Sequence, residues 1–205
     1  MNPHFTEASS LAAIDRQVNG NNQNISPAQY EIIRQVIYHT ADFEYISLLK
    51  FSEDALSKGA ASLKVSTPIV VDVPEIQVSI VPELQKTFYN PVYCCATINS
   101  ETRNDKSQIA SGLEALARQH PQGIFIIGQS EIALTTLINL IESKTINPSL
   151  AIATAPVFTK PERKKFSGSS FPRIYVDGSK GSATVASAIL NSLVDLTWRA
   201  YGQDK

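Results

Sequence analysis

The sequence is poor in the residues that build covalent or metal-linked scaffolds. Of its 205 residues, two are cysteine and three are histidine. Cys94 and Cys95 are adjacent within an apolar run, and neighbouring residues of a strand point to opposite faces, so a disulfide between them would need strained geometry. We therefore expect no structural disulfide and no cysteine zinc site.

Charge of one sign and long hydrophobic runs are also lacking. Eighteen basic and nineteen acidic residues give a formal net charge of -1, so no overall field attracts nucleic acid or an anionic membrane. No apolar run approaches the roughly 18–20 residues of a membrane span, and the start, MNPHFTEASS, lacks the features of a signal peptide. These absences predict a soluble, cytoplasmic protein with neither nucleic acid nor membrane as a partner, in which any anionic ligand is held by local charge.

The remaining composition is that of an ordinary globular protein. Hydrophobic residues make up 43% of the chain, and no linker rich in Gly, Ser or Pro divides it. We predict one domain over residues 1–205, with residues 1–25 as a peripheral helix and loop. The helical spacing of Leu11, Ile14 and Val18 supports that peripheral helix.

Helix signals follow the peripheral segment. The sequence SPAQ at 26–29 predicts a capping box with proline in the first turn, opening a helix that ends near the polar cluster 38–42. Ser52 is predicted to cap a further helix that runs to Leu63.

The rest of the chain alternates between strand and helix patterns. Apolar runs predict strands at 68–73, 92–96, 123–127, 150–153 and 173–176. Amphipathic stretches predict helices at 107–118, 131–143 and 182–201. This alternation favours an α/β fold, an open and mostly parallel sheet with helices on both faces. Ligands of such sheets bind beyond the carboxyl ends of the strands.

His39 is the histidine best placed for chemistry. It stands beside Tyr38, Thr40 and Asp42 at a predicted helix end. There it is either a general acid that titrates near neutrality or a histidine favoured by the helix dipole. The residues alone leave both interpretations open.

Two further polar residues stand at predicted strand ends or loops. Asp72 ends a buried strand, where it faces a loop, an amide cluster or a ligand, or else caps a helix beginning near Pro74. Arg103, after Thr102, is either a carboxylate clamp or an exposed surface residue.

Two glycine-containing loops have anion-binding character. Residues 178–182, with Lys180 between strand and helix, offer amides, a helix N-terminus and one cation. They do not form a Walker loop, because no Gly-Lys-Ser/Thr is present. Gly128, Gln129 and Ser130 likewise precede a helix, with a simple turn glycine as the alternative.

Taken in order, these segments resemble the precorrin-8X methylmutase family of cobalamin biosynthesis. RQVIYHTADF at 34–43 is similar to the family's Arg-Arg-Val-Ile-His-Thr-Thr-Ala/Gly-Asp-Phe. Further similar segments are 51–55 (Phe-Ser-x-x-Ala), 69–72 (Ile-x-x-Asp), 102–103 (Thr-Arg), 128–134 (Gly-Asn-Ala-Pro-Thr-Ala-Leu) and 178–183 (Gly-Arg-Lys-Gly-Gly-Ser). The segment 154–164 keeps only the Glu-x-Lys end of the family's pattern.

The histidine is displaced by one position relative to the family. In an ungapped alignment the family's catalytic histidine falls on Tyr38, and one residue is a rotation of about 100° around a helix. We expect a loosened last helical turn to bring His39 into the site.

The resemblance implies an isomerase that moves a methyl group from carbon 11 to carbon 12 of precorrin-8X, or of its cobalt form, to give hydrogenobyrinate or cobyrinate. It implies His39 as proton donor, no cofactor, no metal ligands, a tetrapyrrole as the small-molecule partner, and a homodimer. The implied substrate-binding residues are Tyr38, Thr40, Asp72, Thr102, Arg103, Gly128, Gln129, Ser130 and Lys180. The alternatives are an impaired relative that binds tetrapyrroles without isomerising them, and an α/β protein for another anionic metabolite.

Overall fold

The computed structural model describes residues 3–18, 25–98, 107–156, 160–168 and 170–202, and its centre is a six-stranded sheet of order β1-β6-β5-β4-β2-β3. The strands are β1 (Leu49–Phe51), β2 (Ile69–Val71), β3 (Val92–Cys94), β4 (Ile124–Ile127), β5 (Leu150–Ala153) and β6 (Arg173–Val176). β2 to β6 are parallel, and β1 pairs antiparallel with β6. The predicted mostly parallel sheet is confirmed, and β1 is the strand that the sequence patterns missed.

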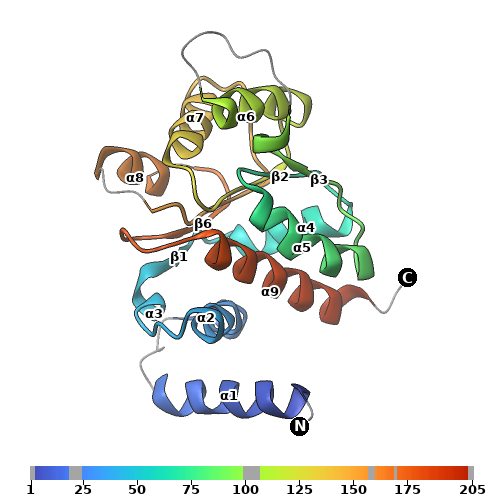
Figure 1. Cartoon of the computed structure of the whole chain (residues 1–205), viewed down its shortest axis with the longest axis vertical. Helices are drawn as coiled ribbons and strands as arrows, with labels where there is room; N and C mark the ends of the chain where they lie inside the picture. Colours follow the sequence, from blue (N-terminus) through green and yellow to red (C-terminus); the bar gives the residue numbers. More distant parts are fainter. Residues whose placement is uncertain (1–2, 19–24, 99–106, 157–159, 169, 203–205) are drawn as a thin grey trace.

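Helices cover both faces of this sheet. They are α1 (Pro3–Val18), α2 (Pro27–Thr40), α3 (Tyr45–Leu48), α4 (Ala55–Lys64), α5 (Pro74–Lys86), α6 (Gln108–Gln119), α7 (Glu131–Glu142), α8 (Lys160–Ser167) and α9 (Ala183–Tyr201), with a 3-10 turn, η1 (Cys95–Thr97). Figure 1 shows α6, α7 and α8 on one face and α4, α5 and α9 on the other. α2 lies against the outer side of α9, and α1 lies outside α2 (Figure 1).

Two hydrophobic cores result from the alternation of side chains along the strands. Ile124 and Ile126 of β4 face the α5 and α9 side, whereas Phe125 and Ile127 face α6 and α7. The two cysteines are free and buried, and they belong to different cores, Cys94 to the first and Cys95 to the second. Among the described residues, no helix is long and apolar enough to cross a membrane.

One predicted cap is confirmed and another is wrong. The Ser26 hydroxyl accepts from the Gln29 amide while the Gln29 side chain accepts from the Ser26 amide, which is the predicted capping box. Ser52 caps no helix, because α4 begins at Ala55. Ser52 instead exchanges hydrogen bonds with the Arg173 backbone, through its amide at 2.9 Å and its hydroxyl at 3.0 Å, and so extends the pairing of β1 with β6.

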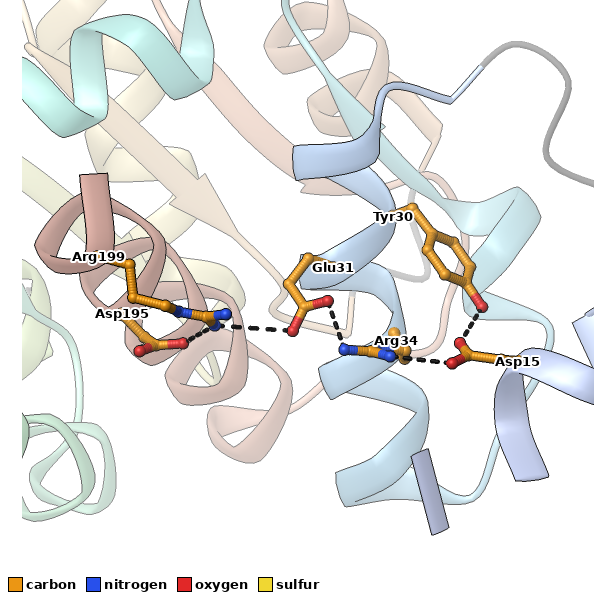
Figure 2. A network of polar contacts seen from close by, with 6 residues as sticks. All are labelled: Asp15, Tyr30, Glu31, Arg34, Asp195 and Arg199. Carbon is orange, nitrogen blue, oxygen red and sulfur yellow. Dashed lines mark hydrogen bonds and ion pairs between the residues drawn. The ribbon is translucent and has the colours of Figure 1, made fainter. Parts of the chain in front are cut away.

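A polar network joins α1, α2 and α9 at the periphery (Figure 2). Tyr30 donates to Asp15 at 2.7 Å, and Arg34 bridges Asp15 and Glu31 at 3.0 and 2.6 Å. Arg199 extends the network from α9 to Glu31 at 3.8 Å. α1 is therefore attached to α2 by directional contacts as well as by its buried residues.

The sheet changes direction between β2 and β4. The connection through α5 leads outward from β2 to β3, and the connection through α7 leads the opposite way from β4 to β5. The two helices lie on opposite faces of the sheet (Figure 1). A crevice opens at the carboxyl ends of strands where the direction reverses, and this is where parallel sheets bind ligands.

Candidate functional site

A cavity of about 320 Å³ lies where α2 ends and where α5 and α9 begin. Its lining includes His39 of α2, Glu75 and Ser79 of α5, and Ala183, Thr184 and Asn191 of α9. Two helix N-termini thus border the cavity, and the partial positive charge of a helix N-terminus favours a negatively charged group.

His39 lies on the last turn of α2, exposed and lining the cavity. Its ring meets the Tyr38 ring edge-on, with centroids 5.2 Å apart and planes at 75°. Tyr38 is half-buried and packs against the core instead. The one-residue displacement therefore turns the histidine away from the core and to the cavity side.

The expectation of a loosened last turn is wrong. α2 stays α-helical through Thr40, and Ala41 ends it in the left-handed conformation with φ 54°, its amide donating to the Ile37 carbonyl. The Thr40 hydroxyl donates to the Val36 carbonyl at 2.7 Å and accepts from the Asp42 amide at 3.3 Å. α2 therefore has a regular end closed by these bonds, with His39 on its last turn.

Lys180 binds two carboxylates of the turn that follows α2. Its ammonium lies 2.6 Å from Asp42 Oδ2 and 2.9 Å from Glu44 Oε2. Hydrogen bonds to Asp42 and then Glu44 raise the pKa of Lys180 to about 12, and the bond from Lys180 lowers the pKa of Asp42. The predicted anion-binding cation is thus held beside the end of α2.

Asp72 follows β2 and is fully buried where the sheet changes direction between β2 and β4, which we call the switch point. One carboxylate oxygen accepts from the Gly128 amide at 3.0 Å, and the other accepts from Gln129 and Ser130 at 2.9 and 2.8 Å. Burial raises the pKa of the Asp72 carboxyl despite the three amide bonds, which act to lower it. Asp72 faces an amide cluster, one of the predicted possibilities.

The other interpretation of Asp72, a cap for the next helix, is wrong. α5 is preceded by Val73, and no side chain caps its first turn. The backbone amides of Gly128, Gln129 and Ser130 donate to the Asp72 carboxylate. This is the structural role of the three residues in the turn after β4. Ser130 also caps α7 by accepting from the Ala133 amide at 3.2 Å.

Two glycines allow the loops around the site to pack closely. Gly181 has φ 143°, and a Cβ there would lie 1.9 Å from the Thr154 carbonyl oxygen. A Cβ on Gly128 would lie 2.5 Å from Ile76 Cδ1 and 3.0 Å from Ala183 Cα. The loops after β4, β5 and β6 therefore meet at the start of α9.

Not every predicted site residue can be placed. Thr102 and Arg103 lie outside the described residues, as does part of the 154–164 segment. The sequence analysis missed Glu75 and Asn191, which line the cavity but belong to no recognisable motif. The small residues at the start of α9 were the one feature of the sequence that could have indicated a cavity there. Within the described ranges, no group of three or more His, Cys, Asp or Glu side chains is arranged to hold a metal ion.

A parallel α/β sheet with a histidine beside a cavity at helix N-termini defines a class, the α/β proteins that bind anionic small molecules beyond the strand ends. A sequence model described as "Precorrin-8X methylmutase" matches residues 6–196. The chain belongs to this family, whose members are isomerases of cobalamin biosynthesis.

Individual relatives agree with this assignment. The chain is 33% identical over 206 residues to the cobalt-precorrin-8 methylmutase of Synechocystis, covering 93% of this chain and 94% of the relative. It is 30% identical to the cobalt-precorrin-8 methylmutase of Methanocaldococcus jannaschii, covering 80% and 77%. The crystal structure of the precorrin-8X methylmutase of Thermus thermophilus superposes with a TM-score of 0.86 at 25% identity, covering 96% and 97%.

Proposed function

We propose that this protein isomerises precorrin-8X, or cobalt-precorrin-8, by moving a methyl group from carbon 11 to carbon 12 of the macrocycle. The observation that carries the proposal is His39, exposed at the end of α2 and facing the cavity between two helix N-termini, in a chain whose relatives are named for this activity.

His39 is the proton donor in this proposal. A histidine near neutral pH can give a proton to the macrocycle and take it back after the methyl group has moved. The methyl group stays within one molecule, so substrate and product are isomers and no electrons are exchanged. Tyr38 supports the imidazole from one side through the edge-on ring contact, and Thr40 supports it by closing the helix end.

The rest of the site binds the substrate's carboxylates. The N-termini of α5 and α9 supply partial positive charge at the cavity. Lys180, in the loop that leads into α9, and Arg103 are proposed to add contacts to carboxylates. Asp72 and residues 128–130 are not among the residues that line the cavity. Asp72 binds the amides of the turn after β4, and Gly128 of that turn packs against Ala183 at the start of α9.

The cavity is smaller than a whole tetrapyrrole. Its volume of about 320 Å³ lies at the lower end of the roughly 300–1,000 Å³ of pockets for drug-sized ligands, and a tetrapyrrole with its side chains is larger than such a ligand. The cavity therefore holds one edge of the ring, next to His39. We propose that a second copy in a homodimer covers part of the remainder, which light scattering of the purified protein tests directly.

Two other expectations stay predictions. A single domain over residues 1–205 is tested by limited proteolysis, and a cytoplasmic location by cell fractionation. No observation favours the alternative of a relative that binds tetrapyrroles without turnover, since His39 lies at the cavity and the named relatives are methylmutases.

The decisive experiment is anaerobic incubation with precorrin-8X, following the visible spectrum as methyl migration changes the conjugation. We expect turnover by the wild type and a loss of about 10²–10⁴-fold in His39→Ala, with substrate binding retained. His120→Ala is the matched control, because His120 stacks on Tyr93 and lies with residues that precede β2, β4 and β5, at the amino ends of the strands. Binding without conversion by the wild type would contradict the proposal, and full turnover by His39→Ala would contradict the role of that histidine.

A further inference from the structure

The contact between Lys180 and the turn after α2 joins two distant parts of the chain. Lys180 belongs to the loop between β6 and α9, and it lies 138 residues from Asp42 in the sequence. The two segments lead into two walls of the same cavity, since α2 ends with His39 and Thr40, and α9 begins with Ala183 and Thr184. The ion pair thus links one wall to the other.

Asp42 is itself anchored to the last turn of α2. Its amide donates to the Thr40 hydroxyl at 3.3 Å, and that hydroxyl donates to the Val36 carbonyl at 2.7 Å. Asp42 Oδ1 accepts from the Glu44 amide at 2.9 Å, which leaves Oδ2 for Lys180 at 2.6 Å. A continuous chain of hydrogen bonds therefore runs from the β6–α9 loop to the helical turn that carries His39.

His39 lies on the part of α2 that helix packing supports least. α2 packs against α9 (Figure 1). Its buried residues, among them Ile33 and Ile37, belong to the same core as those of α9, and this packing fixes the axis of the helix. The final turn lacks helical partners for its carbonyl groups and is the part of a helix that frays most easily. His39 is exposed there and has one aromatic neighbour, Tyr38.

We propose that Asp42 is a positioning residue for His39: its bond to Lys180 fixes the last turn of α2 against the loop before α9, so that the imidazole faces the cavity. This inference rests on the proposed function only in taking His39 as the acid. An ammonium has three N–H bonds. With two given to Asp42 and Glu44, Lys180 keeps one for a carboxylate of the substrate.

The first test observes His39 directly in the free, full-length protein. The chain has three histidines, so their imidazole NMR signals are few, and His39→Ala assigns the relevant one. Asp42→Asn keeps an oxygen for the Glu44 amide but removes the charge that binds Lys180, and Lys180→Gln removes the other partner. We expect both variants to shift and broaden the His39 signal, while the His120 signal stays in place.

Two further variants show that the effect belongs to this pair. Lys180→Arg keeps the positive charge and should retain the wild-type His39 signal. Glu142→Gln removes an ion pair of similar exposure, to Lys165 at 3.3 Å, far from the cavity, and should change neither the His39 signal nor turnover. If Asp42→Asn does not fold, Lys180→Gln tests the same contact at an exposed side chain.

The second test is kinetic. A displacement of about 1 Å at a reacting group can cost up to about 100-fold in rate, and we expect Asp42→Asn to lower kcat about tenfold with little change in KM. Lys180→Gln should lower kcat and also raise KM. The double variant should have a kcat no lower than that of the less active single variant, because the effects of two residues in contact are not additive.

The outcomes separate the two proposals. An unchanged His39 signal in both single variants, or additive losses of kcat, would overturn the positioning role of Asp42. A wild type without turnover would refute the proposed function, while the NMR result would still decide whether Asp42 orients His39.

Discussion

Replacement of Asp72 by asparagine tests the buried contact between the end of β2 and the turn after β4. The two side chains have the same shape, so the substitution leaves no cavity. Asparagine replaces one acceptor oxygen by an NH2 donor, however. Three amides donate to this carboxylate, one to Oδ1 and two to Oδ2.

The size of the effect follows from these contacts. With the asparagine oxygen at the Oδ2 position, the Gly128 amide faces a donor and loses its acceptor, which costs about 1–3 kcal/mol when buried. The two remaining bonds lose their charged partner, at about 1 kcal/mol each, and relief of the buried charge offsets part of the total. We expect Asp72→Asn to lower the free energy of unfolding by about 2–4 kcal/mol.

The assay is urea and thermal unfolding followed by circular dichroism. For a chain of this length the loss corresponds to a fall in Tm of about 5–15 °C. Asp177→Asn is the matched control, because Asp177 follows β6 as Asp72 follows β2 but is exposed; its free energy of unfolding should change by less than about 0.5 kcal/mol. A loss below about 1 kcal/mol in Asp72→Asn would show that the three amides do not depend on this carboxylate.

Other perturbations test the loops, the outer helix and the ion pair. Gly181→Ala should destabilise the fold by about 1–3 kcal/mol in chemical unfolding and lower turnover, because the backbone there is left-handed and the Cβ would meet a carbonyl oxygen; a wild-type Tm would contradict this. Tyr30→Phe removes the bond to Asp15 and should cost about 1 kcal/mol. The pKa of Tyr30 is raised to about 12, chiefly by burial, so its contribution is complete below pH 10 and disappears as pH rises through about 12; Tyr30→Phe should weaken this alkaline loss of Tm. The lowered pKa of Asp42 means that its contribution is present above its ordinary value of 3.8 and disappears as pH falls through the lower folded value. Asp42→Asn should therefore flatten the fall of Tm below pH 3.8. An unchanged dependence of Tm on acidic pH would refute the stabilising contact between Asp42 and Lys180.

Local signals predicted most of the fold because they act over a few residues. The run IFII at 124–127 is buried on both sides of the sheet and forms β4 where expected. The SPAQ capping box opens α2 at the predicted place. β1 escaped detection because the exposed Lys50 interrupts its short apolar pattern, and because the strand is stabilised by pairing with β6, more than 120 positions away in the chain. Ser52 was misassigned for the same reason, since its partner is Arg173.

The sequence by itself determined the α/β class, the alternation of strands and helices from β2 to α9, and the resemblance that singled out His39. The tertiary structure alone decided that Asp72 binds the turn after β4, that Lys180 pairs with Asp42, and that the cavity lies between α2, α5 and α9. The physical reason is the range of the interactions: helix caps and strand patterns depend on neighbours a few residues away, whereas these contacts join segments 50 to 140 residues apart, and only the packed chain brings them within hydrogen-bonding distance.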